Sequence, residues 1–238
     1  MTLADVGRWI IEIFSKAKPQ LAAPDYYLDA HQMATVARLR PFYESAVQMV
    51  VGIPWEVLAA IHYRESEFAC KMSGGEAICG PYAFDVGNAS NSERENLEGY
   101  VERCVKAVCA QYNLPYQTLN NDFRLASVVA ANEFKTKMRG DAVRDGRLTD
   151  EVVADAFWGY NGRSKYHTAD GNPNPNLSTY LFSPYVSNDP KRGVVLRLRG
   201  TIPDGKGGRT HIDTTDERPG AMIIYRELIA RRAEIEAS

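Results

Sequence analysis

The sequence has little excess of either charge. Its 28 Lys and Arg residues stand against 30 Asp and Glu residues, which leaves a formal net charge of -2. A protein whose main role is to bind nucleic acid needs a basic surface that neutralises phosphates. The balance of charges therefore argues against nucleic acid as a partner.

Cysteine is scarce. The chain has four, Cys70, Cys79, Cys104 and Cys109, and their spacings do not match a zinc-binding pattern. We expect no metal site and no cofactor. Free thiols that pack like small apolar side chains are the expected state, and Cys104 falls on the apolar face of a predicted helix. The alternative is a disulfide between Cys70 and Cys79 that brackets a loop.

Long apolar runs are missing as well. No stretch approaches the ~20 apolar residues that a membrane-spanning helix requires, so we expect no stable insertion into a membrane. The first residues do not resemble a signal peptide, because Asp5, Arg8 and Glu12 interrupt the short apolar run there. We expect a protein that is made in a cytoplasm and does not cross a membrane by a signal of its own.

The chain is rich in helical periodicity. With 238 residues, 45% of them hydrophobic, it can form one large domain, or one domain with a small appendage, without metal or disulfide support. A capping-box pattern of Ser92 with Glu95 marks the start of one helix. The apolar spacing predicts helices over residues 2–16, 31–51, 54–68, 92–112, 122–138, 149–160 and 219–236.

The remaining segments indicate turns and a few strands. Residues 71–91 are typical of turns and short strands, and 163–190 form a long loop. Residues 194–202 alternate weakly and are followed by the turn sequence PDGKGG, which predicts a β-hairpin. The expected fold class is therefore mainly α, a helical bundle with a small β-hairpin region.

One carboxylate stands out in the segment IPWEVLAAIHYRESEF. Helical spacing places Glu65 on the same face as Ile61 and Phe68, whereas Glu56 and Glu67 point away from that face. Loss of water would raise the pKa of Glu65, as general acid catalysis at neutral pH requires. The alternative is a glutamate at a helix end that pairs with an arginine or reaches solvent.

Four motifs follow one another in an order that resembles a known family. Their order and separation over residues 32–190 are similar to those of goose-type lysozymes and soluble lytic transglycosylases, in the lysozyme-like superfamily. The motifs are Ile53-Pro54 with Leu58-Ala59-Ala60-Ile61 and Glu65-Ser66, then Cys79-Gly80-Pro81-Tyr82-Ala83-Phe84-Asp85, then Trp158-Gly159-Tyr160-Asn161-Gly162, and then Ser183-Pro184-Tyr185-Val186.

This resemblance implies a fold, an activity and a set of site residues. Residues 31–190 would form a lysozyme-like catalytic domain, preceded by a helix and connector over 1–30 and followed by a hairpin and helix over 191–238. The substrate would be the glycan strands of peptidoglycan, cleaved at the β-1,4 bond between MurNAc and GlcNAc. Glu65 and Tyr160 would be the catalytic residues, and the substrate-binding residues would be Ser66, Tyr82, Asp85 and Asn161.

One position departs from the family's pattern. Ala83 stands where the family usually has Gln, which puts one contact to the sugar in doubt. Asp85 is the best candidate for a second carboxylate, although an aspartate in a turn before Gly87 is an equal interpretation. Without a second acid, the family's other chemistry applies, in which one glutamate serves twice and the product carries an anhydro end.

Two aromatic features agree with this interpretation. Tyr160 ends the apolar stripe of its helix, where it can bury its ring and offer its hydroxyl to a carboxylate, or be an ordinary core residue. We interpret His62 as a supporting or merely packed residue near Glu65. Aromatic side chains that suit the apolar faces of sugars cluster in the loops after the motifs: Tyr82, Phe84, Tyr166, Tyr180, Phe182 and Tyr185.

The expected lack of a signal peptide bears on delivery. Peptidoglycan lies outside the membrane, so the protein would have to reach it by another route. A bacteriophage origin fits the family, either as an endolysin released through a holin or as a virion component. The alternative from another class is a non-enzymatic virion or cell-wall-binding protein on a lysozyme-like scaffold.

Overall fold

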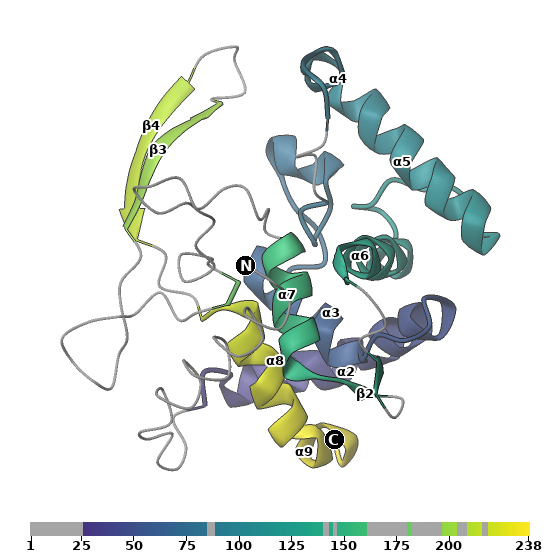
Figure 1. Ribbon diagram of the computed structural model, residues 1–238, viewed down its shortest axis with the longest axis vertical. Helices are drawn as coiled ribbons and strands as arrows, with labels where there is room; N and C mark the ends of the chain where they lie inside the picture. The colour runs from purple at the N-terminus through teal and green to yellow at the C-terminus, as the bar shows by residue number, and fades with distance from the viewer. Residues whose placement is uncertain are drawn as a thin grey trace.

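The computed structural model describes residues 26–84, 89–139, 143–144, 147–160, 180–181, 197–203, 209–215 and 219–238. The protein is mainly helical, as the periodicity predicts (Figure 1). The helices that the structure describes are α2 (Ala30–Met49), α3 (Trp55–Ser66), the 3-10 helix η1 (Gly74–Ile78), α4 (Asn91–Glu95), α5 (Leu97–Tyr112), α6 (Phe123–Lys137), α7 (Asp150–Tyr160), α8 (Ala221–Ala230) and α9 (Arg232–Glu236). The predicted helix over 2–16 lies outside the described residues.

The described residues also include four short strands. They form two antiparallel pairs, β1 (Val143–Arg144) with β2 (Arg147–Leu148) and β3 (Arg197–Pro203) with β4 (Arg209–Thr215). In the second pair Arg197 faces Thr215 and Pro203 faces Arg209.

Helix α3 lies at the centre of the helical body (Figure 1). It packs against α2, α6 and α8, and every residue from Trp55 to Arg64 is buried. A helix that is enclosed on all sides has no solvent face, which explains why small and apolar residues occur all round it. The helix that carries Glu65 is therefore a core element, and only its C-terminal end approaches the surface.

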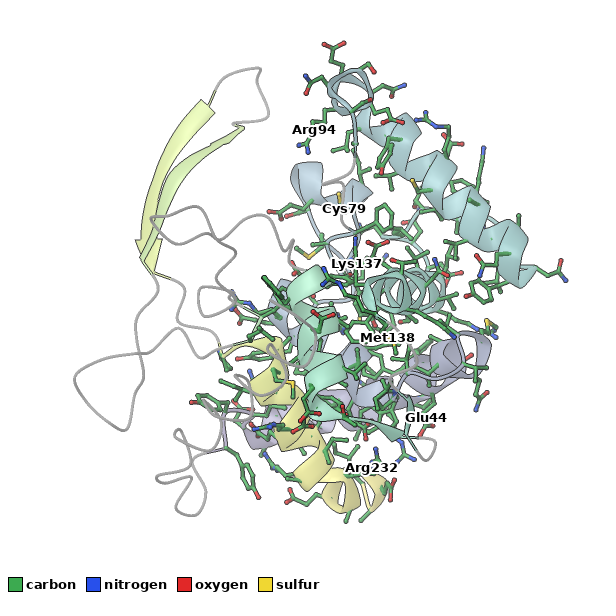
Figure 2. All side chains as sticks on the ribbon, in the orientation of Figure 1. Glu44, Cys79, Arg94, Lys137, Met138 and Arg232 are labelled. Atoms are coloured by element: carbon green, nitrogen blue, oxygen red, sulfur yellow. The ribbon has the colours of Figure 1, made fainter. Side chains whose placement is uncertain are left out.

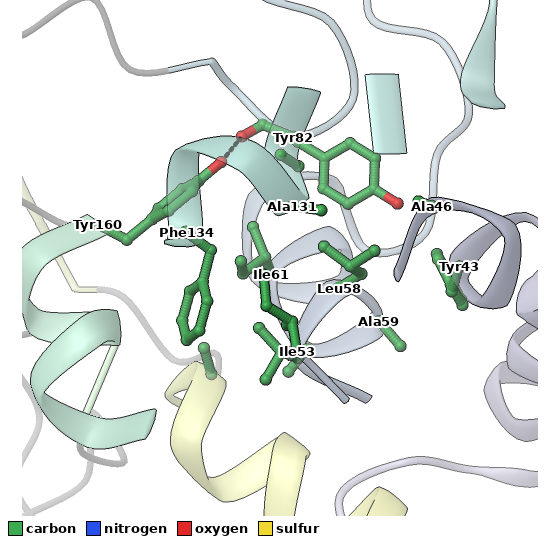
Figure 3. Close-up of a cluster of buried hydrophobic side chains, with 14 of the residues drawn as sticks. Tyr43, Ala46, Ile53, Leu58, Ala59, Ile61, Tyr82, Ala131, Phe134 and Tyr160 are labelled. Carbon is green, nitrogen blue, oxygen red and sulfur yellow. Dashed lines mark hydrogen bonds between the residues drawn. The ribbon is translucent and has the colours of Figure 1, made fainter. Parts of the chain in front are cut away.

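Helices α6 and α7 complete the core beside α3. The two helices pack against each other, and the ring of Phe134 meets the ring of Phe157 edge to face at 5.2 Å between centroids. Figure 3 shows Phe134 in the same apolar cluster as Leu58 and Ile61 of α3. This packing holds α7, which ends at Tyr160, against α6.

The predicted start of the fourth helix is wrong by two residues. The capping box is formed by Ser90 and Glu93, which begin the short helix α4, and not by Ser92 and Glu95. The chain then breaks at Asn96, whose side chain accepts a hydrogen bond from the Gly99 amide and caps α5. Serine at both 90 and 92 precedes an acidic residue by three positions, so the pattern alone does not choose between them.

All four cysteines are free thiols. Cys109 is buried, and Cys70, Cys79 and Cys104 are half-buried. The alternative of a disulfide between Cys70 and Cys79 is therefore wrong for this structure. Cys79 lies at the end of η1, in the turn region after α3 (Figure 2).

The segment after α3 forms turns and one 3-10 helix, and residues 71–84 contain no strand. Gly80 allows this path, because its φ of +69° is a left-handed conformation and a Cβ there would lie 2.6 Å from the Cβ of Leu119. The side chain of Asn120 fastens the segment by accepting a hydrogen bond from the Met72 amide and donating one to the Met72 carbonyl. These contacts fix the turn that carries Tyr82.

The first described residues are tied to the C-terminal helices. The Glu227 carboxylate accepts hydrogen bonds from the amides of Tyr27 and Leu28, at 2.9 and 3.1 Å. Arg231 pairs with Glu227, donates to the Leu28 carbonyl and lies over the ring of Tyr26.

Within the described residues, none of the helices combines the length and the apolar character that crossing a membrane demands.

Candidate functional site

Glu65 lies in the last turn of α3, where the buried helix reaches the surface. Its side chain is half-buried, and its carboxylate accepts a hydrogen bond from the phenol of Tyr180. The two residues are separated by 115 positions in the chain, so the contact is made by the tertiary fold. A carboxylate with a neutral donor beside it, at the end of a rigid helix, is the feature around which the candidate site is built.

Tyr180 is held from two directions. Its carbonyl accepts a hydrogen bond from the Met222 amide at 2.9 Å, which satisfies one of the free amides in the first turn of α8. Its ring lies against the rings of Phe157 and Tyr160, at 6.0 and 5.7 Å between centroids. Burial, and after it the negative charge of Glu65, raises the pKa of Tyr180 well above its usual value. The phenol therefore stays protonated and remains a donor.

Tyr160 packs against Tyr180 and so supports the contact between Tyr180 and Glu65. It is the last residue of α7, and its buried hydroxyl donates to the carbonyl of Tyr82 at 3.2 Å (Figure 3). The sequence predicts that the Tyr160 phenol offers its hydroxyl to a carboxylate or belongs to the core, and in the structure Tyr180 is a phenol that donates to Glu65. The Tyr160 ring packs on Tyr180, and its hydroxyl donates to the backbone of the turn that carries Tyr82.

Tyr82 points away from the candidate site. Its side chain is only 2% exposed, its hydroxyl forms a hydrogen bond with Ser127 at 2.8 Å, and its ring stacks on Phe123. A ring with almost no exposed surface has nothing to offer a sugar, so the expected substrate contact of the Tyr82 side chain is corrected to a core role. Its backbone carbonyl still contributes by accepting the hydrogen bond from Tyr160.

The other predicted substrate-binding residues are Ser66, Asp85 and Asn161, of which the structure describes Ser66. Ser66 is half-buried at the end of α3, and its hydroxyl lies within hydrogen-bonding distance of the carbonyls of His62 and Ala69, at 3.1 and 3.2 Å. These contacts give Ser66 a role in shaping the helix end. Asp85 and Asn161 lie outside the described residues.

The chain leaves α3 through an unusual turn. Glu67 and Phe68 both have left-handed backbone conformations, with φ of 50° and 68°. Side chains other than glycine pay of order 1–2 kcal/mol for this conformation, so neighbouring contacts must hold it. The ring of Phe68 is buried against the rings of His62 and Tyr63.

His62 is fully buried beneath this turn. Its Nε2 lies 3.0 Å from the Ala69 carbonyl, and its Nδ1 lies 2.8 Å from the Tyr43 hydroxyl. A carbonyl only accepts, so Nε2 carries the proton and Nδ1 accepts from Tyr43. Burial lowers the pKa of His62 to about 4, which keeps the ring neutral near pH 7.

The structure reveals a second carboxylate in α3 that the periodicity argument set aside. Glu56 is 0% exposed and is paired with Arg232 of α9. Its pKa is raised, mainly by burial, while the contact with Arg232 opposes that shift. Its Oε2 has no hydrogen-bond partner among the described residues. Figure 2 shows Arg232 at the C-terminal end of the helical body.

Other features of the described surface lie away from Glu65. One hollow lies between α2 and the end of α9 and another where α2, α5 and α6 meet, and Glu65 lines neither of these two. The described part of the chain has no group of three or more His, Cys, Asp or Glu side chains placed to hold a metal ion. The contact between Glu65 and Tyr180 is the candidate site.

The fold and this contact define a mainly helical protein with a carboxylate and a neutral phenol paired at the end of its central helix. Comparison with protein-family models, curated proteins and solved structures finds no match. A functional proposal must therefore start from the chemistry of Glu65 and its neighbours.

Proposed function

We propose that the protein is a peptidoglycan-degrading enzyme, a muramidase or a lytic transglycosylase that cleaves the β-1,4 bond between MurNAc and GlcNAc. The observation that supports this most directly is the hydrogen bond from Tyr180 to Glu65, at the surface end of a helix that is otherwise buried. The order of motifs resembling goose-type lysozymes and soluble lytic transglycosylases supports the same proposal.

Glu65 serves as the general acid and base in this proposal. A carboxylic acid protonates the glycosidic oxygen as the bond to the sugar breaks, and the resulting carboxylate then accepts a proton from the incoming nucleophile. A phenol that stays protonated donates to the carboxylate when it forms, and it adds no charge to the site. Tyr180 meets that requirement because its pKa is raised well above the usual value.

The nucleophile distinguishes the two candidate reactions. In a hydrolase it is water, and the product has a reducing end. In a lytic transglycosylase it is the 6-hydroxyl of the muramic residue, which closes an anhydro ring. Hydrolysis with two acids assigns the second role to Asp85, and the one-acid reaction needs Glu65 alone.

The proposal extends to the surroundings of the site. Residues 31–190 form the catalytic domain, the β-hairpin region lies beside the active-site cleft, and Ser66 and Asn161 contact the glycan. The protein is made in a host cytoplasm and reaches the cell wall as a phage endolysin with the help of a holin, or as a virion component.

Purified protein mixed with isolated peptidoglycan tests this proposal. We expect the turbidity of the suspension to fall, and mass spectrometry of the released fragments to show either reducing or anhydromuramic ends. Glu65→Gln should release neither, whereas Glu67→Gln, which changes an exposed glutamate two residues away, should retain the activity. Tight binding to the wall without fragment release would contradict the proposal and support the non-enzymatic alternative.

A further inference from the structure

The turn that follows Glu65 is held by contacts that converge on one backbone atom. The carbonyl of Ala69 lies 3.0 Å from Nε2 of His62 and 3.2 Å from Oγ of Ser66. The Ala69 amide in turn donates to the Ser66 carbonyl at 3.0 Å. The end of α3 and the start of the next segment are thereby joined across Glu67 and Phe68, the two left-handed residues.

His62 is suited to be the more rigid of the two donors. The serine hydroxyl is shared between two carbonyls and lies at the edge of the turn, whereas the imidazole is fully buried. Its orientation is fixed from the far side by the Tyr43 hydroxyl and by packing against the rings of Tyr82 and Phe123. A ring held on all sides donates in one direction with little loss of conformational freedom.

We propose that His62 is a positioning residue that holds the left-handed turn through the Ala69 carbonyl, and so fixes the helix end that presents Glu65 to Tyr180. The statement about the turn rests on geometry alone. Its consequence for catalysis rests on the proposed function. His62 does not reach the reacting atoms, because it lies one turn before Glu65 and its two nitrogens are directed to Tyr43 and Ala69.

Two amide substitutions test the roles of the two imidazole nitrogens of His62 one at a time. Gln places an N–H donor near the position of Nε2, so His62→Gln retains the bond to Ala69. Asn is shorter and places its amide near Nδ1, so His62→Asn retains a polar group toward Tyr43 and loses the bond to Ala69. Both variants are uncharged and smaller than His, which makes them matched controls for each other.

Alkylation of Cys70 by iodoacetamide reports on the turn without requiring enzymatic activity. This half-buried thiol follows Ala69 directly, and Cys104, half-buried in α5, is an internal control. Peptide mapping by mass spectrometry gives both rates in one sample. Relative to Cys104, we expect Cys70 to react about tenfold faster in His62→Asn and within about twofold of the wild type in His62→Gln, as the loss of one buried hydrogen bond implies.

Fragment release from peptidoglycan then tests the link to Glu65. We expect His62→Asn to lose about tenfold in rate and His62→Gln to restore it. Equal behaviour of the two variants, or faster alkylation at Cys104 as well, would overturn the role of the bond to Ala69. Faster alkylation of Cys70 with an unchanged rate of lysis would overturn the positioning of Glu65.

Two further results keep the tests separate. If the wild type releases no fragments, the proposed function fails, and the alkylation rates still decide whether His62 holds the turn. If His62→Asn does not fold, ¹⁵N NMR of the wild type decides the same point. A proton on Nε2 is expected, and a proton on Nδ1 would overturn the proposal.

Discussion

Helix α3 carries a glutamate near each end, and the two carboxylates differ in exposure and in partner. Glu56, in the first turn, is 0% exposed and is paired with Arg232. Glu65, in the last turn, is half-buried and accepts a hydrogen bond from Tyr180. The more deeply buried carboxylate, Glu56, is thereby joined to Arg232 of the distant helix α9, and Glu65 meets the phenol of Tyr180.

Burial alone therefore does not identify a catalytic acid. A buried carboxylate paired with a guanidinium joins two elements of the fold, here α3 and α9, and is held away from solvent. A carboxylate at a helix end beside a protonated phenol can gain and lose a proton where a substrate can reach it. The partner and the position, more than the degree of burial, separate the structural residue from the candidate catalytic one.

The largest expected effect tests this separation directly. Glu65→Gln should reduce the rate of fragment release from peptidoglycan by at least ~10²-fold, because the general acid is lost. Glu56→Gln should keep most of the rate per folded molecule. Release measured at equal concentrations of folded protein, checked by circular dichroism, gives both values. An inactive Glu56→Gln variant beside an active Glu65→Gln variant would reverse the two assignments.

Removal of the charged partner should affect stability. Arg232→Met leaves the Glu56 carboxylate buried without its cation, which should cost about 3 kcal/mol of unfolding free energy at pH 7. The loss should shrink as the pH falls and Glu56 takes up a proton. Urea denaturation measures the effect, and the double variant Glu56→Gln, Arg232→Met should regain most of it. An additive double variant would show that the two side chains are not coupled.

Near the other end of α3, protonation of His62 should make the stability of the folded protein depend on pH. Its pKa is about 4 in the folded protein and about 6.5 when exposed, so the unfolded chain binds more protons between these values. Stability should therefore fall as the pH is lowered from about 6.5 to about 4, by roughly 3 kcal/mol, and change little from this group below that range. His62→Gln should lack this component in denaturation curves at each pH. A stability that changes with pH in the same way in the wild type and in His62→Gln would contradict this prediction.

The smallest effect concerns the phenols. Tyr180→Phe removes the donor to Glu65 and keeps the ring, so the rate of lysis should fall about tenfold and the acid limb of its pH profile should move to higher pH. Tyr160→Phe, the matched control, removes the hydrogen bond to the Tyr82 carbonyl and should cost only about 1 kcal/mol of stability. A larger catalytic loss from Tyr160→Phe than from Tyr180→Phe would return the donor role to Tyr160.

The helices could be predicted from the sequence because each has its own local signals. The predicted range 122–138 compares with α6 at Phe123–Lys137, and 149–160 compares with α7 at Asp150–Tyr160. The faces of α3 were harder to predict. Glu67 is exposed, as its position off the apolar face indicates, but no local pattern shows that the opposite side of the helix is covered by α8 and that Arg232 of α9 meets Glu56. Glu56 was therefore expected to point away from the core, although it is buried.

The candidate site could be predicted only in part. Glu65 was singled out by its motif, and Tyr180 was noted as one of several aromatic residues in loops. Its contact with Glu65 spans 115 positions and depends on the start of α8, where Met222 binds its carbonyl. No local pattern encodes such a contact. The tight turn after Glu65 was also missed, because Glu67 and Phe68 are not residues that favour left-handed conformations.

The central position of α3 has a consequence for how the protein folds while it is synthesised on the ribosome. Its partner α8 is synthesised roughly 150 residues later, which takes on the order of ten seconds at usual rates of translation. During that interval the nascent chain has no α8 to cover one apolar side of α3, nor Arg232 to neutralise Glu56. Chaperone binding to this segment, rather than folding of the N-terminal half by itself, is the expected course of its synthesis.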